Sequence, residues 1–322
     1  MTDELVRGVF YSVLIVTVVL TATAMALWFE RKFAARLQTR LGPTMVGPSG
    51  LLQPVADLLK LLQKEDIVPT NADSAIFNLV PLLAALAALG AAAVVPFSPS
   101  VVASDLDVGV LYVLAVGAVT VIPVFGAGWA SNNKLALLGG MRAVAQSISY
   151  EVPLLLAAMV PVILSGSLRL GAIVQTQADH HWFVVWPFFI GVPAFVIFVL
   201  AMLAEANRIP FDIPEAESEL VAGVTTEYTG MKFAVFLMAE YIHTLVASAV
   251  GAALFLGGWD GPFRPGLHWM VLKTLLLFAS VYWIRWSLLR FRSDQLMTLC
   301  WKFLVPAGVL LVAAAAVWVV LL

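Results

Sequence analysis

The chain has 322 residues, of which 61% are hydrophobic and 12% charged, with a mean hydropathy of +0.97 and a formal net charge of -2. So apolar a composition predicts an integral membrane protein, because lipid is the solvent in which such a surface is stable, and we expect no nucleic acid among its partners. The single cysteine, Cys300, excludes an internal disulfide and cannot hold an iron-sulfur cluster, which needs about four ligands. We expect it to be a small buried residue.

Eight apolar runs are long enough to cross about 30 Å of hydrocarbon as helices. The first is longer than the apolar region of a signal peptide and is followed by Glu30, so we interpret it as a retained span. No repeat, polar linker or soluble catalytic domain interrupts the pattern. The sequence therefore predicts an all-α protein with one polytopic membrane domain over residues 1–322. The runs are 8–29, 74–95, 108–128, 143–164, 186–204, 233–256, 268–289 and 303–322.

The basic residues predict the orientation of this domain. An even number of spans places both termini on one side, and 14 of the 18 lysines and arginines then fall in the loops and helix ends of the other side. The positive-inside rule assigns the basic side to the cytoplasm. We therefore expect both termini on the periplasmic side of a bacterial inner membrane, or the equivalent side of an organellar inner membrane.

The first predicted cytoplasmic connection, residues 30–73, contains an amphipathic segment. After glycines and prolines at 42–50, apolar residues repeat at helical spacing up to Leu62, and the other face carries Gln53, Asp57, Lys60, Gln63 and Lys64. At roughly 14 residues the segment is too short to span and is expected to lie in the interface. It is either a surface anchor or one wall of an opening for a lipid-soluble ligand, with Asp57 and Lys60 at the rim.

Two positions near this side carry acids beside or within apolar runs. Glu30 and Arg31 follow the first span and could be an ordinary interfacial ion pair. Glu151 lies inside the fourth span, two residues before Pro153, which cannot donate a backbone hydrogen bond. Glu151 is either a neutral structural donor or a member of a proton relay with Arg142 or Glu205 as its partner.

The most unusual segment is the acidic loop, residues 205–232. It gathers six carboxylates beside one arginine, Arg208, although a carboxylate at the edge of lipid is costly unless it pairs, meets water or takes up a proton. Pro214 could begin a helix whose positive end Glu215 and Glu217 would complement. That explanation leaves the remaining acids unexplained, so we predict a coupled proton-handling group. Its members are Glu205, Asp212, Glu215, Glu217, Glu219 and Glu227.

Glu240 in the sixth span precedes His243 by three residues, which is half of the carboxylate-bridged di-iron pattern. The other half is missing, so we expect no metal site, a proton-path role for Glu240 and a local hydrogen bond for His243. No glycine-rich nucleotide loop or paired-cysteine motif occurs, so nucleotide binding and electron storage would belong to other chains.

Four long blocks, residues 30–66, 128–153, 204–233 and 292–306, together resemble the family of the H subunit of NADH:quinone oxidoreductase, respiratory complex I. The resemblance implies a component of a proton-translocating enzyme, with quinone as substrate. It places NAD, FMN and iron-sulfur clusters in partner subunits only. The implied partners are the peripheral-arm iron-sulfur and quinone-site subunits, the small membrane subunits leading to antiporter-like subunits, and the bilayer.

The resemblance also implies roles for individual residues. A quinone chamber and its entrance would involve Glu30, Arg31, Gln38, Arg40, Asp57, Lys60, Arg142, Arg208 and Tyr228, and the acidic loop with Glu151 and Glu240 would form the proton-coupling path. Related membrane-bound hydrogenases and quinone or phenazine reductases share part of these blocks. A purely structural anchor for the peripheral arm is a further alternative, whereas the paired interrupted spans of a secondary transporter are not seen.

Overall fold

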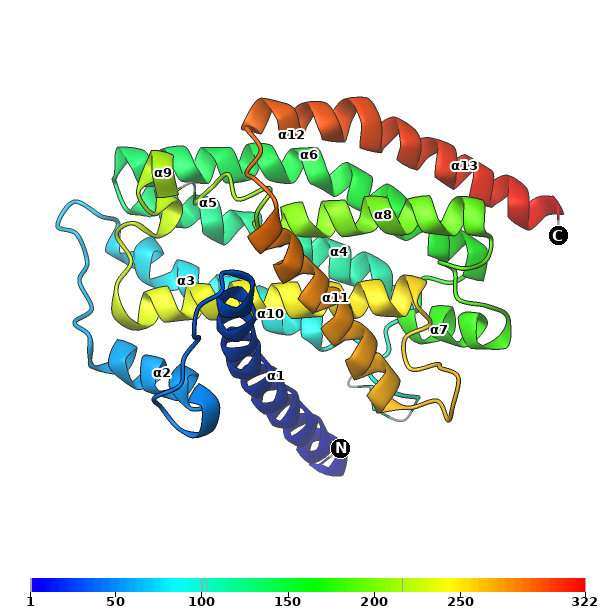
Figure 1. The fold of residues 1–322 in the computed structure, drawn as a ribbon, viewed down its shortest axis with the longest axis horizontal. Helices are drawn as coiled ribbons and strands as arrows, with labels where there is room; N and C mark the ends of the chain where they lie inside the picture. Colours follow the sequence, from blue (N-terminus) through cyan, green and yellow to red (C-terminus); the bar gives the residue numbers. More distant parts are fainter. Residues whose placement is uncertain (1, 100, 103, 216, 322) are drawn as a thin grey trace.

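The computed structural model describes residues 2–99, 101–102, 104–215 and 217–321, without the side chains of residues 2–12, 217 and 218. Within these ranges the regular structure is helical, apart from an isolated bridge between Ser98 and Val101. Eight helical segments of the described chain are long and apolar enough to cross a membrane, which confirms the predicted all-α membrane class (Figure 1). They are α1 (Thr2–Leu37), α3 (Ser74–Ala92), α4 (Gly109–Val119) with α5 (Val121–Ala130), α6 (Lys134–Ser165), α8 (Phe188–Glu205), α10 (Gly230–Phe255), α11 (Leu267–Ser287), and α12 (Ser293–Leu299) with α13 (Val305–Leu321).

Two of the spans are locally irregular. The third breaks at Thr120, three residues before Pro123, which has no N–H to donate to the carbonyl of Val119. The eighth contains a π-helical turn, Cys300–Leu304, which ends two residues before Pro306. Cys300 is buried in that turn, as expected. The eighth span begins at Ser293 and not at residue 303, because its first turns are polar and escape a hydropathy criterion.

The fourth span is also longer than predicted. α6 begins at Lys134, where the side chain of Asn133 accepts a hydrogen bond from the backbone N–H of Leu135 at 2.8 Å. It continues without a break through Pro153 and Pro161. The extra turns, which include Arg142, extend the helix beyond its apolar part toward the acidic loop.

The shorter helices lie at the two ends of the bundle. The predicted amphipathic segment forms α2 (Gln53–Gln63), which has no fully buried residue and exposes Leu59 and Leu62, in agreement with an interfacial position. α7 (Leu170–Asp179) was not predicted, because only one face of it is apolar and buried. Between the end of α8 and the start of α10, the described residues of the acidic loop form α9 (Glu217–Leu220) and the 3-10 turn Gly223–Thr225.

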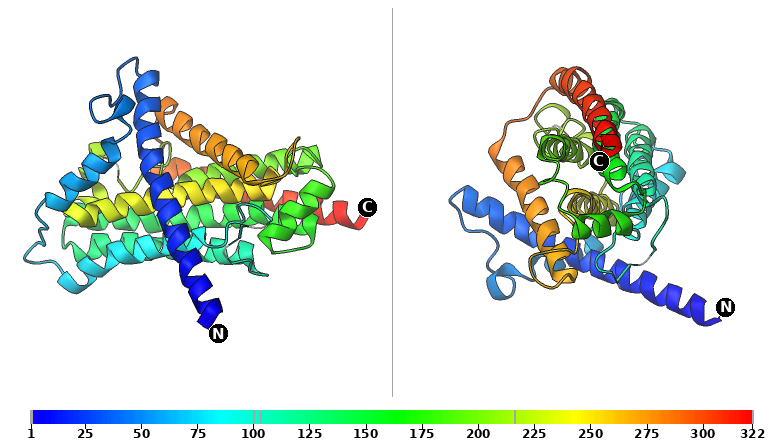
Figure 2. Two further views of the ribbon diagram at one scale, coloured as in Figure 1. Left: turned by 90° about the horizontal axis from the view of Figure 1, so that it is seen from below. Right: turned by 90° about the vertical axis from the view of Figure 1, so that its right-hand side faces the viewer.

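The spans form a bundle around α6, α8 and α10, with α3, α4 and α5 on one side and α12 and α13 beside α6 (Figure 1). α1 and α11 run obliquely across one face of this bundle, as the two further views show (Figure 2). Alanines such as Ala158, Ala194 and Ala253 are completely buried between the central helices, so the helix backbones can approach one another closely. In lipid, where water provides no hydrophobic driving force, such close packing holds helices together. α2 and the acidic loop share one end of the bundle, and α7 lies at the other.

A buried lysine fastens the α7 end. The ammonium of Lys273 on α11 donates to the carbonyls of Leu256 and Asp260, both at 2.5 Å, and lies 4.1 Å from the ring centre of Trp182. Trp182 in turn donates to the Asp260 carboxylate at 3.0 Å. A cation at the C-terminal end of α10 satisfies carbonyls that the helix leaves open. This end of α10 is therefore fixed, while its other end borders the acidic loop.

Candidate functional site

A cavity of about 330 Å³ lies between α3, α5, α10 and the segment that follows α8. Its apolar wall includes Ala84, Ala88, Val124 and Phe236. The polar part of its wall brings together side chains from four separate segments of the chain. These are Thr120, Glu205, Arg208, Glu215, Glu240, Tyr241, His243 and Arg285. An apolar space with charges gathered at one side fits a molecule that has a polar head and an apolar body.

Arg208 is the centre of the charged part. Its side chain is only 3% exposed and pairs with Glu240 on α10, with 3.0 Å between Nη1 and Oε1. Its guanidinium also lies 4.6 Å from the ring centre of Tyr241 and 5.6 Å from that of Tyr282. Two further donors of this buried group, Nε and Nη2, have no hydrogen-bond partner among the described residues. Arg208 is thus held between an acid and two aromatic rings, and it is one of the residues that line the cavity.

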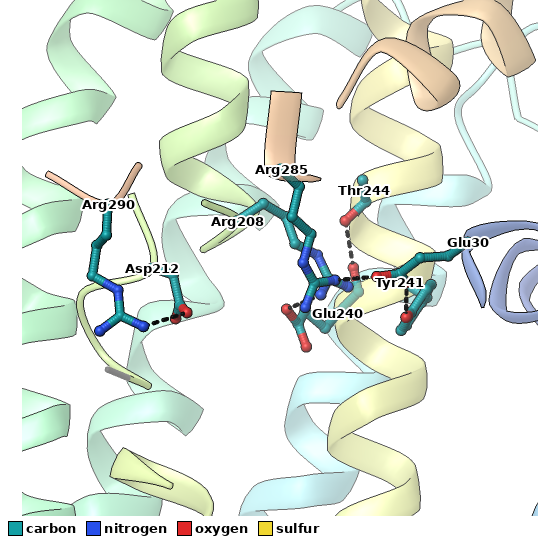
Figure 3. Close-up of polar contacts among 8 residues, drawn as sticks. All are labelled: Glu30, Arg208, Asp212, Glu240, Tyr241, Thr244, Arg285 and Arg290. Atoms are coloured by element: carbon teal, nitrogen blue, oxygen red, sulfur yellow. Dashed lines mark hydrogen bonds and ion pairs between the residues drawn. The ribbon is translucent and has the colours of Figure 1, made fainter. Parts of the chain in front are cut away.

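A second ion pair joins α1 to α11 beside Arg208 (Figure 3). Glu30 is buried, and its Oε1 accepts a hydrogen bond from Nη1 of Arg285 at 2.5 Å while Oε2 accepts one from the Tyr241 hydroxyl. Of the alternatives left open for Glu30 and Arg31, an ion pair between the two residues is therefore not the one observed. Arg31 instead pairs with Asp57 on α2, because neighbouring residues of a helix point in different directions. The first span thus contributes an acid to the interior and a base to the surface.

Glu215 is partly buried in the cavity wall. The loss of hydration, followed by repulsion from Glu240 and Asp212, raises the pKa of its carboxyl to about 8, although Arg208 and Arg285 act in the opposite direction. Asp212 is itself paired with Arg290, with 3.4 Å between the two side chains. A carboxyl with such a pKa holds a proton at neutral pH.

We expect an infrared carbonyl band of a protonated carboxyl to disappear as the pH rises through about 8 and to be absent from Glu215→Gln. The folded-state pKa is raised, so the stabilisation from this proton is fully present below the ordinary carboxyl pKa and is lost as the pH passes 8. Glu219→Gln is the control, since the Arg142 hydrogen bond lowers the pKa of Glu219. An unchanged band in Glu215→Gln would contradict the assignment.

Glu205, at the end of α8, and His243 on α10 form a third pair. Their Oε1 and Nε2 atoms are 3.4 Å apart, and both side chains are nearly buried. His243 therefore has a partner from another helix, whereas a local hydrogen bond was expected. Glu151 is not paired with Arg142 or Glu205; its Oε1 accepts a hydrogen bond from Ser147 on the preceding turn at 2.6 Å. Glu151 belongs to the polar face of α6, outside the cavity wall.

The other predicted site residues lie around the cavity. Arg142 pairs with Glu219 at 2.6 Å, and Glu227 accepts a hydrogen bond from Asn133 at 2.6 Å, so the middle and the C-terminal part of the acidic loop are fastened to α6 and to its N-cap residue. Tyr228 stacks on Phe77 with 4.1 Å between ring centres. The alternative in which Pro214 begins a helix is not observed, because α9 starts at Glu217, whose side chain lies outside the described residues.

The residues predicted at the α2 end remain near the surface. Gln38 accepts a hydrogen bond from Arg40 at 2.7 Å, and Asp57 accepts one from Gln53 at 3.0 Å in addition to its pairing with Arg31. Lys60 is exposed on α2. None of the predicted α2 residues lines the cavity. Among the described residues, no group of three or more histidine, cysteine, aspartate or glutamate side chains could hold a metal ion.

Sequence reasoning missed Tyr241 and Arg285 as members of the site. Arg285 is one of the 14 basic residues predicted on the cytoplasmic side, and no role is predicted for Tyr241. A signal did exist for both, since Tyr241 directly follows Glu240 and Arg285 is the one charge in the last turn of α11. A charge within a span is seldom placed there without a partner.

Comparisons with known proteins place the chain in a family. The family model described as NADH dehydrogenase matches residues 10–316. The chain is 45% identical over 306 residues to the NADH-quinone oxidoreductase H subunit of Dehalococcoides mccartyi, covering 95% of this chain and 85% of that one. It is 47% identical to the protein of that name from Brevibacillus brevis, covering 95% and 91%, and 46% identical to that from Thermomicrobium roseum, covering 96% and 94%.

Proposed function

Because the chain belongs to the family of the NADH-quinone oxidoreductase H subunit, we propose that it forms the membrane end and entrance of a quinone-binding chamber and the start of an acidic proton-coupling path. It would work as a membrane component of a proton-translocating NADH:quinone oxidoreductase. The observation that carries the proposal is the buried Arg208, which lines a cavity with an apolar wall, is paired with Glu240, and has two side-chain nitrogens without a hydrogen-bond partner among the described residues.

The chemistry of a quinone fits this arrangement. Its carbonyl oxygens accept hydrogen bonds and become negative as electrons arrive, so a positively charged donor stabilises the reduced form more than the oxidised one. Arg208 and Arg285 supply such charge at the cavity wall, and the alanines and Phe236 supply apolar contacts. The electrons would come from partner subunits that hold the NAD, FMN and iron-sulfur sites, because no redox group is expected on this chain.

Proton coupling follows from the same electrostatics. Negative charge that develops near Arg208 competes with Glu240 for the positive charge of the arginine and weakens the ion pair. The carboxylates around Arg208 then bind protons more tightly or transfer them. Glu215 holds a proton near neutral pH and can supply it to the reduced quinone. The acids titrate as a coupled group, so the change is shared among Glu240, Glu215, Glu30 and the Glu205–His243 pair.

The entrance would lie between α1 and α2, at the end that the peripheral arm covers. α2 exposes apolar side chains toward lipid, while Asp57 and Arg31 form an ion pair between the two helices and Lys60 is exposed. An amphipathic helix in the interface provides a path for a lipid-soluble substrate, because its apolar face is continuous with the bilayer. The peripheral-arm and small membrane subunits are the proposed partners, with both termini on the periplasmic side.

Glu215→Gln in the assembled complex tests the proposal. We expect normal assembly and normal NADH oxidation by a water-soluble artificial acceptor, but a loss of quinone-dependent turnover and proton transfer of about 10²-fold, as for removal of a general acid. The matched control is Asp105→Asn, which changes an acid that pairs with Arg169 beside the start of α7, away from the acidic loop. Full quinone turnover in Glu215→Gln would favour the anchor alternative, in which the chain only holds the peripheral arm.

A further inference from the structure

We propose that Gly117 is a positioning residue for the acidic path, because the lack of a side chain there allows the Glu205 carboxylate to reach His243. The inference rests on the proposed function of Glu205. A Cβ atom at Gly117 would lie 2.3 Å from Oε1 of Glu205, far inside the van der Waals distance. That same oxygen forms the 3.4 Å contact with Nε2 of His243. Three spans, containing α4, α8 and α10, therefore meet at one carboxylate.

The backbone of Gly117 gives no reason for a glycine. The residue lies within α4 and is not among the glycines with a positive φ, so alanine would fit its conformation and favour the helix by up to about 1 kcal/mol. Space is the requirement, since the contact at this position is with a side-chain oxygen. Alanine at this position is expected to stabilise α4 but to displace the Glu205 carboxylate. Because the two effects are opposite, a requirement for backbone conformation can be distinguished from a requirement for space.

The break in the third span lies next to this contact. The Gly117 carbonyl accepts hydrogen bonds from the backbone N–H of Thr120 at 3.0 Å and from its hydroxyl at 2.6 Å. Thr120 and Glu205 both line the cavity, and His243 lines it as well. The tightened turn and the bare Cα of Gly117 thus form one surface against which the Glu205 carboxylate rests. The pair is placed at the cavity edge by the third span, which carries no ionisable group at this point.

Displacement of the carboxylate is the expected result of a methyl group at Gly117. The obstructing atom is the far end of a side chain at the last residue of α8, so the carboxylate can swing away without unfolding a helix. The Glu205–His243 pair is then broken. Small misplacements of reacting groups cost large factors in rate, so we expect quinone-dependent proton transfer to fall by about tenfold in Gly117→Ala.

The test uses the whole complex in its native membrane. Gly117→Ala is compared with Gly126→Ala in α5, where an added Cβ would meet only a methyl carbon of Val80 at 3.2 Å. We expect both variants to assemble and to oxidise NADH with an artificial acceptor, and only Gly117→Ala to lose quinone-linked proton transfer and change its pH profile. Equal losses in both variants, or none in Gly117→Ala, would overturn the proposal.

A rescue distinguishes positioning from a general structural effect. The shorter side chain in Glu205→Asp leaves room for a methyl group at Gly117. Adding Gly117→Ala to Glu205→Asp should therefore lower quinone-dependent proton transfer by less than about twofold, whereas the same change in the parent protein lowers it by about tenfold, because the two changes affect one contact. Equal losses in both backgrounds, or failed assembly in both, would overturn the inference. If Glu205→Gln retains full proton transfer, the proposed function of Glu205 fails, which is a different result from an ineffective Gly117→Ala.

Discussion

Arg208→Gln is expected to abolish quinone-linked turnover and to destabilise the protein within its complex. The change leaves Glu240 without the 3.0 Å partner that balances its charge, and removes an arginine that lies against the rings of Tyr241 and Tyr282. Breaking a buried ion pair by removing one partner costs about 3–5 kcal/mol. The pKa of Glu215 should rise further, because Arg208 is one of the two cations that lower it. The Glu215 carboxyl would then keep its proton when quinone is reduced.

Two comparisons make this expectation specific. Arg208→Lys keeps the charge but loses the planar donor group and its contact with both rings, so we expect assembly with quinone turnover reduced by at least about tenfold. Arg292→Gln removes one member of an ion pair whose side chains are 81% and 67% exposed, so it should change neither the quinone turnover nor the thermal stability of the complex. Thermal inactivation and quinone turnover are measured on the purified complex. Retained turnover in Arg208→Gln would contradict the central role of this arginine.

The sequence predicts which segments span the membrane but not which charges meet. Hydropathy identifies each span by itself, and the acidic loop stands out because its composition differs from that of its surroundings. Glu30 and Arg285 are 255 positions apart, and no local pattern relates them. Their contact depends on how obliquely α1 and α11 cross the bundle, which packing against other helices decides (Figure 2). For the same reason the sequence leaves the partner of the neighbouring Arg31 open, and the structure pairs it with Asp57.

Some features could have been predicted from residues that hydropathy ignores. Pro123 in the third predicted run indicates a break, and the structure has one at Thr120. The polar segment before residue 143 could have been recognised as helix from Asn133, a good N-cap residue. The role of Gly117 could not be predicted from the sequence, because glycine is common in apolar runs. Its importance depends on the carboxylate that lies next to it in the fold. Sites of this kind become visible only when three segments are placed together.

The charges at α1 and α11 should behave as one unit in a double-mutant cycle. Glu30→Gln leaves Arg285 close to Arg208 with one fewer acid, and Arg285→Gln leaves a buried Glu30 with only the Tyr241 hydroxyl as partner. Each single change should therefore lower the thermal stability of the complex strongly. The double variant removes both charges together, so we expect it to be more stable than the sum of the single effects by about 2–3 kcal/mol.

The control cycle uses Arg31→Gln and Asp57→Asn, an ion pair between α1 and α2 whose side chains are 45% and 32% exposed. Solvent screening should limit its coupling energy to less than about 1 kcal/mol. The measurement is the midpoint of thermal inactivation of each variant complex, repeated at high salt. Additive effects at Glu30 and Arg285 would mean that α1 is held by apolar packing alone. A coupling that persists at high salt would instead show that α1 is fixed at the site by a desolvated ion pair, as the geometry of Glu30, Tyr241 and Arg285 requires.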